Sequence, residues 1–129
     1  MEIAVNLQSI KEVLPSDVEL IAVSKTHPIG TIMRAYDAGH RAFGENKVQE
    51  ALTKWSDLKK SNPNLKLHMI GKLQSNKVKN AVEIFDYIHS LDNQKLADVL
   101  ARNQANLGKK LKYFIQVNIG NETQKSGIP

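Results

Sequence analysis

The sequence alternates short apolar runs with longer segments of helical period, and this alternation constrains the fold more than any other feature. The expected strands cover residues 19–24, 41–43, 67–70, 87–89 and 113–119. The segments between them repeat apolar residues three and four positions apart, as amphipathic helices do, and residues 3–14 predict one more helix before the first strand. Strands joined by single helices pair in parallel, because each right-handed crossover returns the chain beside the preceding strand.

The predicted fold class is therefore α/β, with about five parallel strands and flanking helices. No linker, internal repeat or low-complexity stretch interrupts the pattern, so residues 1–129 are expected to form a single domain. Five strand–helix steps fit either an open doubly wound sheet or part of a (β/α)8 barrel of the TIM type. The pattern alone leaves both architectures open.

Composition excludes several classes of site. The chain has no cysteine, which rules out disulfides, thiolate metal sites and a cysteine nucleophile. No apolar run approaches the ~18–20 residues that a membrane span requires, and the N-terminus lacks a secretory signal pattern, so a cytoplasmic location is expected. Lys and Arg number 18 against 13 Asp and Glu, and this net charge of +5 favours anionic ligands. Few aromatic residues interleave with the basic ones, so a nucleic-acid partner is only weakly indicated.

Lys25 is the residue most suggestive of chemistry. It ends the apolar run of residues 20–25 and directly precedes the breaker segment 26–28. Side chains alternate along a strand, so Lys25 should share a face with Ile21 and Val23, at the C-terminal mouth of a strand expected to be buried. A lysine desolvated there has a lowered pKa and can form a Schiff base with an aldehyde. The alternative is a solvated lysine at a strand end, with no chemical role.

Polar residues follow the other strands and should meet Lys25 at one rim, because the carboxyl ends of parallel strands lie at the same edge. Asn46 follows the second strand, and the loop 71–76, with Ser75 and Asn76, follows the third. All three side chains could instead only cap the helices that they precede. His68, within the third strand, could be a hydrogen-bonded core histidine.

Glu45 and Asp92 are single carboxylates, each expected to be a cap or a solvated group. The four histidines show no paired spacing, which makes a metal site improbable. The glycine-rich motifs that cradle nucleotide phosphates are also missing from the sequence.

Four blocks of the sequence together resemble a known family, the pyridoxal phosphate homeostasis proteins (YggS/PROSC family). The blocks cover residues 22–26, 43–50, 68–77 and 125–128. The resemblance implies an alanine-racemase-like (β/α)8 barrel of the fold-type III proteins that use pyridoxal 5′-phosphate (PLP). The family's strand-one lysine, which holds PLP as a Schiff base, corresponds to Lys25, and its asparagine near the cofactor corresponds to Asn46. On the same resemblance, His68, Ser75 and Asn76 are expected to border the cofactor.

The function implied by the resemblance is intracellular PLP binding and homeostasis, with no established reaction and no catalytic residue. Two alternatives stay open. A PLP-dependent amino-acid racemase would need a second base opposite Lys25. A basic nucleic-acid-binding or scaffold module would use Lys72, Lys77 and Lys79. Lys72 is also a departure from the family, whose members usually carry histidine or proline there.

Length is the larger departure, since single-domain barrels of this class run to about 250 residues. The family's phosphate-binding elements lie beyond the fifth strand, outside this sequence. Bound PLP is therefore expected to be weak or absent in this chain. Open edges at the first and fifth strands also predict pairing with another chain, for example as a homo-oligomer.

Overall fold

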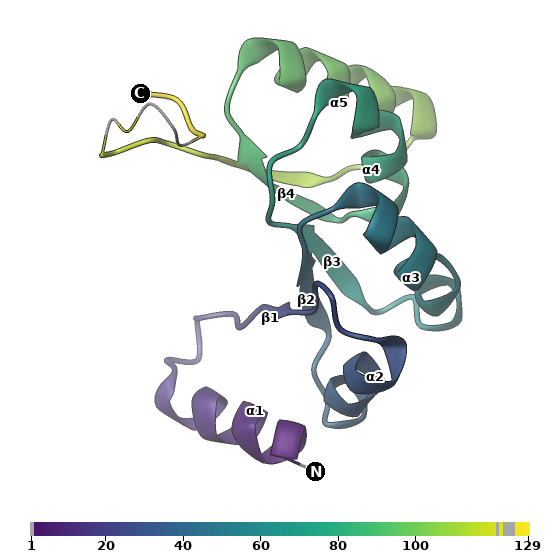
Figure 1. The fold of residues 1–129 in the computed structure, drawn as a ribbon, viewed down its shortest axis with the longest axis vertical. Coiled ribbons are helices and arrows are strands. Elements are labelled where there is room, and N and C mark those ends of the chain that lie inside the picture. Colours follow the sequence, from purple (N-terminus) through teal and green to yellow (C-terminus); the bar gives the residue numbers. More distant parts are fainter. Residues whose placement is uncertain (1, 121, 123–125) are drawn as a thin grey trace.

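The computed structural model describes residues 2–120, 122 and 126–129, and it consists of one sheet with helices packed against it (Figure 1). Its elements, in chain order, are α1 (Glu2–Val13), β1 (Ala22–Val23), α2 (Ile29–Asp37), β2 (Ala42–Glu45), α3 (Val48–Ser61), β3 (Lys66–Met69), η1 (Ser75–Lys77), α4 (Val78–Ile84), β4 (Tyr87–Leu91), α5 (Gln94–Leu107) and β5 (Lys112–Ile115). None of these helices is both long and apolar enough to cross a membrane.

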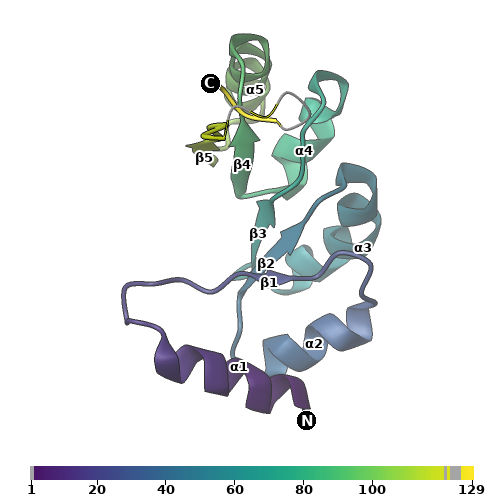
Figure 2. The ribbon, with the colours of Figure 1, turned by 60° about the vertical axis from the view of Figure 1, so that its left-hand side comes forward.

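The five strands form one parallel sheet in the order β1-β2-β3-β4-β5, as the alternation of strands and helices predicted. Helices α3, α4 and α5 lie on the same side of the strands (Figures 1 and 2). A doubly wound sheet reverses its strand order and carries helices on both faces. The sequential order therefore selects the barrel-type winding, in which each unit is added beside the last.

The hydrophobic core lies between the sheet and its helices. Alternate strand residues point into this layer and are almost fully buried: Phe43, Leu67, Met69 and Ile88. They pack with buried helix residues, of which Trp55 is the largest. Phe43 lies against Trp55 with ring centroids 5.2 Å apart. Each such side chain stabilises the fold by about 1.5–3 kcal/mol relative to exposure.

The opposite face of the sheet is open at β1, and here the sequence prediction was wrong. The run 20–25 was expected to be a fully buried strand, but Val23 is 50% exposed and Lys25 is exposed as well. The paired part of the strand is only Ala22–Val23. The physical reason is that β1 is an edge strand, and the face that carries Val23 and Lys25 is left uncovered by the part of the chain that the structure describes. An apolar run in the sequence does not show whether one face of its strand is covered or two.

The other strands also differ from the predicted ranges: β3 is shifted by one residue to Lys66–Met69, and β4 runs on to Leu91 rather than ending at residue 89. β2 continues through Gly44 to Glu45, and β5 ends at Ile115 rather than at residue 119. After β5 the chain makes an isolated parallel bridge between Val117 and Ile128, in which the Asn118 N–H donates to the Ile128 carbonyl at 2.6 Å. Lys125, part of the last motif block, lies outside the described residues.

Candidate functional site

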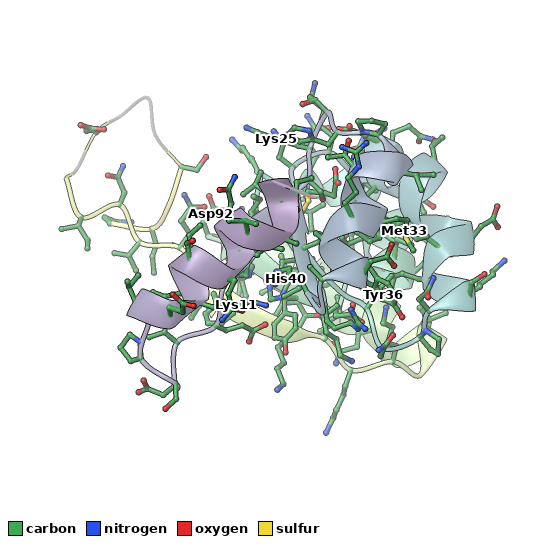
Figure 3. The ribbon with its side chains drawn as sticks, turned by 90° about the horizontal axis from the view of Figure 1, so that it is seen from below. Lys11, Lys25, Met33, Tyr36, His40 and Asp92 are labelled. Carbon is green, nitrogen blue, oxygen red and sulfur yellow. The ribbon has the colours of Figure 1, made fainter. Side chains whose placement is uncertain are left out.

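The strand register places Lys25 and Asn46 at the same end of the sheet. Val23 pairs with Gly44, and Gly44 pairs with His68. Lys25 and Asn46 each follow a member of this row by two residues, so both leave the carboxyl end of their strands. In Figure 3, Lys25 lies well away from His40, which precedes β2. Among the described residues no carboxylate pairs with the Lys25 amine, which stands at an exposed position open to a ligand.

The turn that carries Lys25 has an unusual backbone. Thr26 has φ +64°, a left-handed conformation that β-branched residues rarely adopt and that costs on the order of 1–3 kcal/mol. Three hydrogen bonds hold it. The Thr26 N–H donates to Glu50 Oε2 at 2.8 Å, the Thr26 hydroxyl donates to the Lys25 carbonyl, and the His27 N–H donates to the Ser24 carbonyl at 3.0 Å.

Lys54 of α3 connects this turn to the helix layer. Its ammonium donates to the Ser24 carbonyl at 2.8 Å and to the His27 carbonyl at 2.9 Å, so it holds both ends of the turn. It also lies 2.9 Å from Glu45 Oε2 and 3.4 Å from Glu50 Oε2. Its side chain is only 10% exposed. Sequence reasoning missed this residue, because an isolated lysine in an amphipathic helix is normally a solvated group.

Glu45 is fully buried beneath the turn, which corrects the expectation of a cap or a solvated carboxylate. Its Oε2 accepts from the Ser24 hydroxyl at 2.6 Å and from Trp55 Nε1 at 3.0 Å, besides pairing with Lys54. These partners offset part of the cost of burying a charge, which is several kcal/mol for an isolated carboxylate, while Glu45 Oε1 is buried without a hydrogen-bond partner among the described residues. Glu45 is buried because β2 extends through it and its side chain follows Phe43 onto the helix side.

A cleft of about 480 Å³ opens between the segments that follow β2 and β3. Its polar lining residues come from both segments: Asn46, Lys47, Gln49, Lys72, Gln74 and Lys77. A Cβ at Gly71 would lie 2.5 Å from the Asn46 carbonyl oxygen, so only glycine allows the two segments to approach this closely. Asn46 and the loop 71–76 thus border one cleft, and Lys25 does not line it.

The alternative role of Asn46, Ser75 and Asn76 as helix caps was wrong, because none of them is an N-cap residue. Lys47 rather than Asn46 is the N-cap residue of α3, and Gln74 precedes η1; neither makes a side-chain capping bond. Ser75 is half-buried and Asn76 is exposed, both in η1 beside the cleft but outside its lining. The structure therefore brings Asn46 close to the 71–76 loop, while Ser75 and Asn76 remain at its periphery.

His68 lies on the face of the sheet opposite the helices, and it is 2% exposed. Its ring stacks on Tyr87 with centroids 4.0 Å apart, and its Nδ1 lies 2.9 Å from His89 Nε2. Burial, reinforced by the neighbouring His89, lowers the pKa of His68 to about 4. The imidazole is therefore neutral at neutral pH. His89 in turn stacks on Phe114, which extends the aromatic row across β3, β4 and β5.

The sequential parallel sheet and the lysine at its carboxyl edge define the class of protein: an α/β protein with barrel-type winding and an amine at the rim. Residues 1–129 match the family described as alanine racemase, N-terminal domain, and the chain belongs to that family. It is 48% identical over 113 residues to the pyridoxal phosphate homeostasis protein of Pasteurella multocida, covering 88% of this chain and 48% of the relative. The corresponding protein of Haemophilus influenzae is 47% identical over 111 residues, covering 86% and 47%. The chain spans about half the length of the curated relatives it matches.

Solved structures of similar proteins have the same fold as this chain. PipY of Synechococcus elongatus PCC7942, a COG0325 family member, superimposes with a TM-score of 0.93 without PLP and 0.90 with PLP bound, at 48% and 46% identity. These matches cover 98% of this chain and 59% and 58% of PipY. An alanine racemase of Clostridium difficile 630 aligns over 98% of this chain and 33% of its own length, with a TM-score of 0.76. At 14% identity this last match speaks for the fold alone.

Proposed function

We propose that this chain binds PLP through Lys25 and belongs to a protein of intracellular PLP homeostasis. The observation that carries the proposal is the Lys25 amine, exposed at the carboxyl end of β1 on a turn held by Lys54 and Glu50. The names of the relatives and the PLP-bound PipY structure support it, since the chain aligns with both over most of its length.

The residues present suit the cofactor's aldehyde end. PLP offers an aldehyde that reacts reversibly with an amine, and a phosphate that binds cations and N–H groups. The Lys25 amine has no carboxylate partner in the part of the chain that the structure describes, so its deprotonation and attack on the aldehyde break no ion pair there. We place Asn46 beside it, because the register brings both residues to one edge of the sheet. Ser75 and Asn76 of η1 would border the cofactor from the side of the cleft, and neutral His68, which is 2% exposed, would lie below the surface of the sheet face that carries Lys25.

Retention of the cofactor is expected to be weak. We propose that residues 1–129 form the N-terminal part of an alanine-racemase-like barrel, whose further strands would cover the open face at β1. Lys47 and Lys72 line the cleft beside Asn46, but both side chains are exposed. Exposed lysines contribute little to anion binding, because water and salt screen their charge.

Reductive trapping tests the proposal directly. The chain is incubated with PLP, reduced with borohydride, digested, and mapped by mass spectrometry. We expect the pyridoxyl label on Lys25, and we expect Lys25→Ala to lose it while the exposed Lys60 stays at background in both proteins. A label on Lys72 or Lys125 with Lys25 unmodified would contradict the assignment.

A further inference from the structure

We infer that Lys54 is a positioning residue for Lys25: it fixes the left-handed turn 24–27 by binding the carbonyls of Ser24 and His27. This inference rests on the proposed function of Lys25. The two carbonyls stand on either side of Lys25 and Thr26, so one ammonium restrains the backbone at both ends of the segment that carries the amine.

The turn needs such a restraint. The φ of +64° at Thr26 is unfavourable for a β-branched residue, and a free chain would relax to an extended or right-handed conformation. Either change would redirect the Lys25 side chain, because rotation about the Thr26 backbone moves the residues before it relative to the helix that follows. An exposed lysine on a relaxed loop would still be an amine, but it would no longer have a fixed place on the rim.

The surroundings of Lys54 favour this role over that of a simple ion pair. Glu45, fully buried, supplies the counter-charge at 2.9 Å, which alone would satisfy a structural pair. The two carbonyl contacts are additional, and both belong to the turn. Glu50 joins the same group: its pKa is lowered first by the Thr26 N–H that donates to it, and further by Lys54. Lys54 therefore binds two carbonyl acceptors of the turn, and Glu50 accepts a hydrogen bond from its Thr26 N–H.

Helix α3 also offers a matched control. Lys59 binds the Ile84 carbonyl at 2.9 Å and Asp86 Oδ2 at 2.7 Å, with a side chain 16% exposed against 10% for Lys54. Both lysines thus join a backbone carbonyl and a carboxylate on neighbouring elements, but Lys59 does not touch the turn. Lys54→Met leaves the fully buried Glu45 without its cation and should lose more stability than Lys59→Met, whose partner Asp86 is 20% exposed and still accepts from the Leu67 N–H. The labelling rate, measured on folded protein, separates the two roles, because only Lys54→Met should affect Lys25.

The experiment measures the initial rate at which PLP and borohydride modify Lys25 in the full 129-residue chain, relative to Lys60, at a fixed PLP concentration and over a range of pH. We expect Lys54→Met to lower this rate by roughly tenfold or more, because it removes two charge-assisted hydrogen bonds to the turn and one such bond alone corresponds to about tenfold. Lys59→Met should leave it within about twofold of wild type, a range small compared with one such bond. Lys54→Arg, which can still donate to both carbonyls, should restore most of the rate.

Each outcome decides something. If Lys25 is not labelled in the wild-type chain, the proposed function fails and the inference falls with it. If Lys25 is labelled but Lys54→Met and Lys59→Met behave alike, whether both are slow or both normal, the positioning role is refuted while the proposed function stands. Should Lys54→Met not fold, the double variant Lys54→Met/Glu45→Gln removes both buried charges and must still show the slow labelling.

Discussion

Acid pH should destabilise this fold mainly through His68. Burial lowers the pKa of His68 to about 4, with His89 as the second cause, while the pKa of an unfolded histidine is 6.5. The unfolded chain therefore binds a proton in this interval that the folded chain excludes, so stability falls as the pH drops from 6.5 to about 4 and levels off below that. The groups that face the ring are His89 and Tyr87 of β4 and Glu19, whose Oε1 lies 3.9 Å from His68 Nε2.

The magnitude follows from the two pKa values. At 1.36 kcal/mol per pH unit, the interval from 6.5 to about 4 amounts to roughly 3 kcal/mol when the folded ring stays neutral throughout. Most of this free energy of unfolding is lost at pH values above the folded pKa. Between pH 7 and pH 5 the expected loss from His68 is therefore about 2 kcal/mol. Domains are typically stable by about 5–15 kcal/mol, so the loss is large enough to measure.

Urea unfolding at pH 7 and pH 5, followed by circular dichroism, tests this expectation. His68→Phe keeps an aromatic ring against Tyr87 and cannot titrate, so its stability should fall by about 2 kcal/mol less than that of wild type over the same interval. His40 and His89, whose pKa values are also lowered by burial, should leave a smaller slope in the variant. An equal loss of stability in wild type and His68→Phe would refute the reasoning.

Three further predictions concern single contacts, each measured by urea unfolding at neutral pH. Gly71→Ala should cost about 1–3 kcal/mol because its Cβ meets the Asn46 carbonyl, whereas the control Gly30→Ala, with nothing within 4 Å, should be neutral or stabilising; equal effects would contradict this. Trp55→Phe removes the donor to buried Glu45 and should cost about 1–3 kcal/mol, and no loss would show that this bond contributes nothing. Asn93→Ala removes the side chain that caps α5 at the Leu96 N–H and should cost about 1 kcal/mol, whereas Asn106→Ala, near the other end of the helix, should not.

The order of elements was predictable because it depends on local pattern. Each apolar run and each helical segment carries its own period, and Gly108 with φ +70° ends α5 as a glycine commonly does. The resemblance of the four sequence blocks also identified the family. The pattern of apolar residues could not show that one face of β1 is open, because that depends on which other elements of the fold pack against the strand.

The network beneath Lys25 was not predictable from the sequence. Lys54 lies 30 residues from Ser24 along the chain, and nothing in its neighbourhood distinguishes it from the solvated lysines of the same helix. Glu45 looked like a turn residue because it follows Gly44, and only the extension of β2 shows that its side chain enters the helix layer. Contacts of this kind arise from the register of neighbouring strands, which sequence periodicity does not specify.

Nearest-neighbour pairing of the strands has a consequence for how the chain acquires its structure. Each of the five strands pairs with the next one along the chain, so partners such as Ala22 and Phe43 are separated by about 20 residues. Pairing in this sheet therefore needs no contact between segments far apart in the sequence. Each new strand and helix can therefore dock on the edge left by the previous unit as the polypeptide emerges from the ribosome, N-terminus first. We expect growing chains that end after successive helices to gain protease resistance in steps, each step adding one strand–helix unit.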